Sequence, residues 1–472
     1  MSDHGQNLLR TVNTRRSRRQ FFVDLGCATL GTTTVYSSLS HLGAASALAT
    51  PGPDDYRALV CILQAGGNDS FNMLVPTSAP EYAEYAAIRQ DLALAQGELL
   101  PLADSGIAGR TFGVHPQMPE VRQLYDQGNL AFVANVGTLV EPTTLAQIDA
   151  GTAKLPLGLY SHSDQIQQWQ TSTPDLRGGT GFGGRLADAL SALNTSNQVS
   201  MNVSVAGSNL FQNGLSTVEF AVSPSGESLG LNGYDGDGFY DQLRTAAINS
   251  LINDRYVHLF EREYAGRIRG ALDSAEVFSA ALEATPPLTT IFSPTGISQS
   301  LQMVARTIAA RDVLGHRRQT FFVLFGGWDH HDEVLVNQAN MLPQVSTALG
   351  EFFAATEELG VAAEVTTFTI SDFGRTLTSN GRGSDHGWGG NQMVMGGAVA
   401  GSKIYGEFPS LFAGNALDTG RGRLIPTTSV DEYFAEMALW FGVDPGSLDG
   451  VLPNIDRFYD AATGEPPLGF LS

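Results

Sequence analysis

Residues 58–63 have the sequence Ala-Leu-Val-Cys-Ile-Leu and lead into the turn Gly66-Gly67-Asn68-Asp69-Ser70. A short apolar run that stops at paired glycines predicts a buried β-strand followed by a tight turn. The pattern returns at residues 320–325, Thr-Phe-Phe-Val-Leu-Phe, which stop at Gly326-Gly327. Residues 365–370, Val-Thr-Thr-Phe-Thr-Ile, form a third such run. The three segments predict strands of one buried sheet.

Segments with helical periodicity lie between these strands. Residues 118–126 and 342–359 are predicted to be helices, and residues 130–134 form a further predicted strand. Strands that alternate with helices indicate an α/β fold, in which helices cover both faces of a mostly parallel central sheet. In such a sheet, ligands bind beyond the carboxyl ends of the strands.

The middle of the chain, residues 191–298, has a different composition. It is rich in Ser, Asn, Gly and Thr, and it is predicted to be helical from about residue 237 to residue 282. We interpret it as an insertion or cap on one α/β domain that spans residues 50–472.

The N-terminus has the parts of a removable export segment. Residues 10–19 contain five arginines, and the run Ser17-Arg18-Arg19-Gln20-Phe21-Phe22 resembles a twin-arginine export signal. A mostly apolar stretch follows to about Leu42, and Ala47-Leu48-Ala49 offers a cleavage site. We predict that residues 1–49 are removed, that the twin-arginine export machinery is a partner, and that the protein is periplasmic or extracellular. The alternative is a disordered basic tail.

The charge and the cysteine content argue against binding to nucleic acid or anionic membranes and against an intrachain disulfide. The chain has a net charge of −21, and residues 1–49 hold five basic and only two acidic residues, so the mature protein is more acidic still. A protein this acidic is not expected to bind nucleic acid or an anionic membrane surface. Because Cys27 leaves with the export segment, Cys61 stands alone and no intrachain disulfide is expected.

Carboxylates and histidines follow three predicted strands. Since the carboxyl ends of parallel strands share one edge of the sheet, these side chains are expected to converge. Carboxylate and imidazole are the ligands of zinc, manganese or iron. The alternative for each aspartate is an ordinary turn or helix-cap residue. The candidate metal ligands are Asp69, Asp329, His331, Asp372, Asp385 and His386.

The same segments resemble a known family. The chain is similar to the exported family DUF1501, a branch of the alkaline phosphatase and sulfatase superfamily. The resemblance implies an alkaline phosphatase-like three-layer α/β/α sandwich with an inserted cap region. The residues that carry it are 63–69, 326–331, 371–376, 385–389, 395–399 and 405–406.

The resemblance also implies a mechanism and a ligand set. Superfamily members hold one or two metals at the strand ends, and a hydroxyl or modified Cys at a helix start attacks phosphorus or sulfur. Asp329 and His331 resemble the ligand pair of one metal, with His386 the last histidine and Asp385 an additional ligand. The first-strand aspartate and the aspartate of the other metal correspond to Asp69 and Asp372. In a rival register, Asp385-His386 is itself the aspartate–histidine pair.

The chain departs from the superfamily pattern at Phe373, where a histidine is expected after Asp372. In the rival register no histidine follows His386, and Asn391 stands where a later ligand is expected. Either way one imidazole is missing. A single metal, a carboxylate-rich site for a harder ion such as calcium, or a site without catalysis would each agree with this departure.

The attacking group is sought at a predicted helix start, Tyr160-Ser161-His162-Ser163. Ser161 or Ser163 is the candidate nucleophile, because free N–H groups at a helix start stabilise an anion. His162 is a candidate acid or base. Arg375 is a candidate clamp for an oxyanion, or alternatively the partner of a neighbouring acid. Ser161 would alternatively cap the helix. Ser70 is a second candidate nucleophile, and His115 either lines the same pocket or is buried by packing.

The sequence therefore predicts an exported hydrolase of phosphate or sulfate esters that uses a divalent metal: zinc, manganese or calcium. Its substrate would be a small-molecule or polymer-borne ester. The alternative is a non-catalytic relative that keeps the fold and binds a ligand or partner at the cell surface.

Overall fold

The computed structural model describes residues 55–226, 234 and 236–471. The predicted export segment, residues 1–49, lies outside these described residues, so its interpretation stays a prediction. Among the described helices, none combines the length and the apolarity that a membrane span requires.

A nine-stranded sheet forms the centre of the described part of the chain, with the strand order β11-β5-β10-β9-β1-β8-β6-β7 and with β12 paired to β5. β1 is parallel to both β8 and β9, and β10 is antiparallel to both β9 and β5. The sheet is thus mostly parallel, which confirms the predicted α/β class. The strands are β1 (Arg57–Ala65), β5 (Leu130–Gly137), β6 (Asn202–Ser204), β7 (Phe220–Ala221), β8 (Arg318–Gly326), β9 (Val365–Ser371), β10 (Gly390–Met395), β11 (Ile404–Tyr405) and β12 (Thr428–Ser429).

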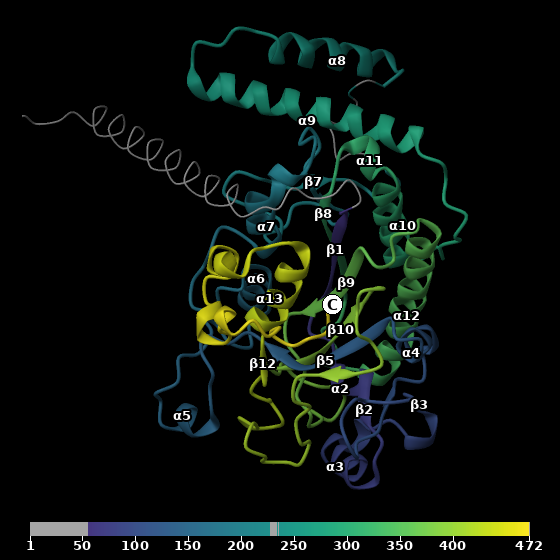
Figure 1. Ribbon diagram of the computed structural model, residues 1–472, viewed down its shortest axis with the longest axis vertical. Coiled ribbons are helices and arrows are strands. Elements are labelled where there is room, and N and C mark those ends of the chain that lie inside the picture. Colours follow the sequence, from purple (N-terminus) through teal and green to yellow (C-terminus); the bar gives the residue numbers. More distant parts are fainter. Residues whose placement is uncertain (1–54, 227–233, 235, 472) are drawn as a thin grey trace, which may run out of the picture. The chain divides into compact units, whose positions relative to one another are not determined.

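Helices cover both faces of this sheet, as Figure 1 shows. One face packs against α10 and α12, and the other against α7 and α13. The three layers therefore agree with the expected α/β/α sandwich. The longer helices are α3 (Ala79–Arg89), α4 (Pro119–Asp126), α6 (His162–Thr171), α7 (Phe182–Leu190), α8 (Phe239–Ile252), α9 (Leu259–Ala284), α10 (Gly296–Ala309), α12 (Val334–Glu358) and α13 (Val430–Phe441).

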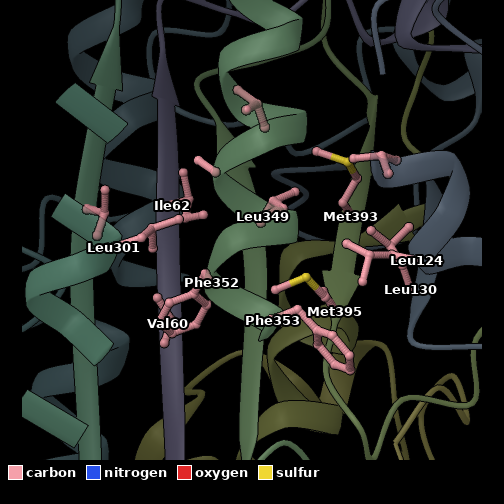
Figure 2. Close-up of a cluster of buried hydrophobic side chains, with 14 of the residues drawn as sticks. Val60, Ile62, Leu124, Leu130, Leu301, Leu349, Phe352, Phe353, Met393 and Met395 are labelled. Carbon is pink, nitrogen blue, oxygen red and sulfur yellow. The ribbon is translucent and has the colours of Figure 1, made fainter. Parts of the chain in front are cut away.

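The alternation of side chains along β1 explains the two cores. Ala58, Val60 and Ile62 point into one core, while Leu59 and its neighbours at alternate positions point into the other. Figure 2 shows the first core, in which phenylalanines of α12 lie against β1 and β10. Full burial of each large apolar side chain contributes about 1.5–3 kcal/mol, so a strand that is apolar on both faces is held firmly in the centre.

Residues 191–298 contribute both to the sheet and to the helices beyond it. β6 pairs with β8, and β7 pairs with β6 at the sheet edge, whereas α8 and α9 follow as two long helices separated by residues 253–258. The description of this segment as an insertion or cap stays a prediction.

Smaller elements complete the fold. A second, three-stranded sheet has the order β2-β4-β3, and α2 follows β1 directly. Cys61 is a buried free thiol within β1. The remaining elements are α2 (Ser70–Met73), β2 (Leu74–Pro76), β3 (Leu100–Pro101), β4 (Phe112–Val114), α5 (Leu145–Asp149), α11 (Arg311–Leu314), α14 (Leu448–Val451) and the short 3₁₀ helices Gln90–Leu92, Gln96–Glu98, Ser191–Leu193, Pro445–Ser447, Ile455–Arg457 and Ala461–Thr463.

Candidate metal centre

The carboxyl ends of β1, β8 and β9 lie side by side. Ala65 of β1 is in register with Gly326 of β8, and Gln64 with Ser371 of β9. The loops that follow these strands therefore start at one edge of the sheet. They are packed so tightly that a Cβ atom on Gly66, whose φ is +121°, would lie 2.4 Å from the backbone nitrogen of Asp329. Only glycine allows this approach.

Three histidines surround the carboxylate of Asp329 at this edge. The Nε2 atoms of His331 and His386 lie 3.1 Å and 3.4 Å from its Oδ1. The Nε2 atom of His162 lies 3.4 Å from its Oδ2. The Nε2 atoms of His331 and His386 are 2.9 Å apart. Three imidazoles and one carboxylate thus direct their ligand atoms toward the same small volume.

The opposite nitrogen of each histidine is held by an acceptor. His162 Nδ1 lies 2.6 Å from Asp372 Oδ2, and His331 Nδ1 lies 3.0 Å from Asp385 Oδ1. His386 Nδ1 lies 2.8 Å from the carbonyl oxygen of Tyr160. An acceptor at Nδ1 favours the proton there and leaves the Nε2 lone pair free, which is how metal-binding histidines are commonly oriented.

The donor set fits a transition-metal ion. The ligand atoms of His162, Asp329 and His386 all lie within 4.8 Å of one another, and His331 Nε2 lies closer still to two of them. Neighbouring donors of a tetrahedral zinc site are roughly 3.4 Å apart, given metal–nitrogen distances of about 2.1 Å. Four of the six donor separations approach this value, but His331 is not among the three residues whose ligand atoms all lie within 4.8 Å of one another. His162 Nε2 is also buried without a hydrogen-bond partner, as expected for a ligand atom.

The neighbours favour the ligand protonation state at Asp329 and His386, but not at His162. Burial would raise the pKa of Asp329, but the hydrogen bond and charge of Arg375, 2.7 Å away, lower it overall. Burial lowers the pKa of His386, which favours the neutral imidazole. The hydrogen bond to Asp372 raises the pKa of His162 against the effect of burial. A divalent cation would compete with that proton.

Asp385 anchors the far side of the cluster. Burial would raise the pKa of its carboxyl, but hydrogen bonds from Asn380, His331 and Arg421 lower it to about 2. The carboxylate is therefore ionised at neutral pH and keeps His331 oriented.

Two backbone positions next to the centre are left-handed. Tyr160 has φ +72° and directs its carbonyl oxygen to His386, while its own N–H donates to Gln165 Oε1 at 2.6 Å. Arg421 has φ +64°. Non-glycine residues in this region carry strain that commonly marks functional sites.

The predicted ligands do not all join the cluster. Asp329, His331 and His386 converge, while Asp372 and Asp385 stand behind the imidazoles and orient them. Asp69 is nearly fully buried and pairs instead with Arg89 at 2.7 Å and Ser384 Oγ at 3.0 Å. The roles given to these residues from the sequence stay predictions.

His162, interpreted from the sequence as an acid or base, lies among the ligand atoms. Phe373 packs against it and against His386, with ring centroids 4.8 Å and 4.6 Å apart. The carboxylate of Asp372 thus contacts an imidazole that comes from α6 and not from the next position in the chain.

The candidate hydroxyls have different surroundings. Ser161 precedes α6, where its side chain makes no capping hydrogen bond and lies 3.2 Å from the exposed Ser163 hydroxyl. Ser70 is buried, and its Oγ accepts from the backbone of Asn391 at 2.7 Å. His115 is buried elsewhere, next to the backbone of Met73, and burial lowers its pKa to about 4.

Several residues at this centre were not identified from the sequence. Arg89, Asn380 and Arg421 each contact a candidate residue, but none stands in a motif with characteristic spacing, and the sequence marks Tyr160 only as part of the predicted helix start. Only the glycines that flank Arg421 hint at an unusual backbone.

The sequence profile of a family described as a protein of unknown function, DUF1501, matches residues 237–448. No curated protein matches the chain significantly.

Solved structures show a distant likeness. One is Ps i-CgsB in complex with k-i-k-neocarrahexaose, with 10% identity, a TM-score of 0.33, and coverage of 86% of this chain and 78% of the other. A second is the lipoteichoic acid synthase LtaP from Listeria monocytogenes, with 7% identity, a TM-score of 0.32, and coverage of 86% and 79%. A third is a mutant of the alkaline phosphatase PafA, with 11% identity, a TM-score of 0.25, and coverage of 70% and 64%.

Proposed function

We propose that the protein is a metal-dependent hydrolase of phosphate or sulfate esters. The observation that carries the proposal is the convergence of three Nε2 atoms on Asp329, with each imidazole held at Nδ1 by an acceptor. Such a nitrogen-rich set favours zinc over manganese or calcium, which both suit oxygen ligands better.

The residues would divide the work as follows. His162, His331, His386 and Asp329 would hold the ion, which supplies Lewis acidity toward an ester oxygen. Arg375 keeps Asp329 ionised and in place, because its guanidinium donates to Oδ1.

The hydroxyl of Ser161 or Ser163 is the proposed nucleophile. Both stand at the start of α6, and the backbone N–H groups of its first turn are available to an oxyanion. Ser161 also directly precedes the proposed ligand His162 in the chain.

The experiment that tests the proposal is elemental analysis of residues 50–472 without a His tag, followed by a screen of phosphate and sulfate esters. We expect one equivalent of a transition metal and ester hydrolysis. Asp329→Ala and His331→Ala should lose both, with little change in melting temperature, because both side chains are partly exposed.

The matched control is His258→Ala, since His258 is exposed at the start of α9, outside the cluster. It should keep metal and activity. Full activity of the two cluster variants would rule out this centre as the catalytic site.

A second candidate function is ligand binding without catalysis. The observation that favours it is the pairing of Asp69 with Arg89, together with the position of Phe373 against two of the histidines. A stoichiometric metal without hydrolysis of any ester would support this candidate.

The cellular location of the protein is a further part of the proposal. The paired arginines before an apolar stretch support export by the twin-arginine machinery to the periplasm or beyond. Export of this kind carries folded cargo, which suits a protein that is loaded with metal before it leaves.

A further inference from the structure

The buried arginine of the centre uses four of its five N–H donors within the protein. Arg375 Nη1 donates to Asp329 Oδ1 at 2.7 Å and to Gly66 O at 3.2 Å. Its Nε donates to Ser384 Oγ at 3.4 Å, and Nη2 donates to the carbonyl oxygen of the same residue. Because the side chain is also 0% exposed, Arg375 is poorly placed to recognise an anionic substrate, and an exposed group is better suited to do so.

Arg421 is placed for this task. Its Nη1 lies 2.6 Å from Asp385 Oδ2, and the side chain is 44% exposed. Asp385 in turn holds His331 Nδ1 at 3.0 Å. The guanidinium therefore lies one carboxylate and one imidazole away from the converging Nε2 atoms. An anionic group bound by Arg421 would therefore lie away from the reacting ester.

Hydrogen bonds within the protein preorganise the loop that carries Arg421. The N–H groups of Gly420 and Gly422 both donate to Asp418 Oδ1 at 2.8 Å. Thr378 Oγ1 donates to the carbonyl oxygen of Arg421 at 3.0 Å.

The backbone of this loop is strained at the arginine. Arg421 has φ +64° between two glycines with φ +112° and +70°. A left-handed arginine costs on the order of 1 kcal/mol or more, whereas glycine at the same position would not. Because a glycine would avoid this strain, the arginine at position 421 favours a functional role for its side chain.

We propose that Arg421 binds a second anionic group on the carrier of the ester, so that the substrate is a phosphate or sulfate ester of an anionic compound. The inference rests on the proposed function and names its substrate class. A net charge of −21 repels such a compound from most of the surface. A fixed guanidinium, which binds carboxylate, phosphate or sulfate through two parallel hydrogen bonds, would both attract and orient it.

The test compares two substrates that differ by one anionic group, phenyl phosphate and 3-carboxyphenyl phosphate, and the two corresponding sulfates. The metal-loaded protein should have a kcat/KM about tenfold or more higher for the carboxylated ester, as for a gained charge-assisted hydrogen bond. Arg421→Gln and Arg421→Gly should lose this preference, mainly through KM. Arg421→Lys should keep part of it.

Two controls separate recognition from structure. Arg382→Gln removes an exposed arginine that also pairs with an aspartate, Asp332 at 2.9 Å, and it should keep the preference. Arg421→Gly should melt no lower than the wild type, because glycine relieves the backbone strain. Metal content is measured for every variant.

Each further result has a distinct meaning. No preference in the wild type, or an equal loss for both esters in Arg421→Gln, would overturn the inference and leave the hydrolase proposal standing. Loss of metal in the same variant would make Arg421 a support for Asp385 only, and would also overturn it. No hydrolysis of any of these esters by the metal-loaded wild type would count against the proposed function itself.

Discussion

At the residue scale, the acceptors behind the histidines decide how well the centre can bind a cation. Asp372 illustrates this, because its Oδ2 holds His162 at 2.6 Å while its Oδ1 accepts from the backbone of Gly66 at 3.0 Å. The carboxylate is thus fixed by the same loop whose close packing requires glycine.

Asp372→Asn should weaken metal binding by about 10- to 100-fold, because outer-shell partners of ligating histidines have effects of this size. The asparagine keeps the volume but loses the charge that orients the His162 ring. Competition with a chromophoric chelator measures the affinity. Asp312→Asn, which removes a carboxylate paired with Arg317 away from the centre, is the control and should bind metal as the wild type does. Equal affinity in both variants would contradict the role given to Asp372.

At the element scale, the strands were the most predictable part of the fold. Residues 58–63, 130–134, 320–325 and 365–370 all fall within strands, since continuous apolar runs of this length fit the buried centre of a parallel sheet. The helix predicted from residue 342 begins at Val334 instead. Helix starts depend on turn geometry as much as on periodicity, and so they are harder to place.

The candidate centre was only partly predictable. Asp329, His331 and His386 follow from the rule that ligands gather at the carboxyl ends of strands. The placement of His162 among them does not, because α6 is contributed from a distant part of the chain and no local pattern encodes its contact with Asp372. The same holds for Arg89, whose pairing with Asp69 depends on how α3 packs.

A second element-scale feature is the start of α13. Ser429 and Glu432 form a capping box there, and Asp431 lies between them, fully buried. A helix N-terminus favours a carboxylate, yet burial dominates and raises the pKa of Asp431 to about 7, against the lowering effects of Ser172 and Arg185.

This raised pKa predicts a pH dependence of stability. Between about pH 4 and pH 7, the unfolded chain has released a proton that the native protein still holds, so the free energy of unfolding falls as pH rises through this window. The loss amounts to about 1.4 kcal/mol per pKa unit. Asp431→Asn carries no such proton, and its stability relative to the wild type should therefore increase from pH 5 to pH 8.

Urea unfolding of residues 50–472 at the two pH values measures the effect. Asp449→Asn, an exposed aspartate in α14, should show no such change. A relative stability of Asp431→Asn that is the same at both pH values would mean that this carboxyl does not titrate as described.

At the scale of the whole molecule, the net charge is strongly negative, whereas the charges at the candidate centre are balanced. The chain carries 48 acidic and 27 basic residues, so its surface repels itself at neutral pH. The candidate centre differs, because arginines and histidines there balance the carboxylates through short contacts such as those of Arg375 and Arg421.

Salt should therefore act on the fold and on the centre in opposite directions. Raising NaCl from 10 mM to 500 mM shortens the Debye length from about 30 Å to a few Å and screens the general repulsion. Exposed ion pairs contribute little that could be lost, so the melting temperature should rise. Preference for a doubly anionic ester should fall over the same range, since attraction by exposed Arg421 is screened too. Near the isoelectric pH, where net repulsion vanishes, NaCl should no longer raise the melting temperature. A melting temperature that falls with salt at neutral pH would show that attractive ion pairs, and not general repulsion, dominate the electrostatics of this molecule.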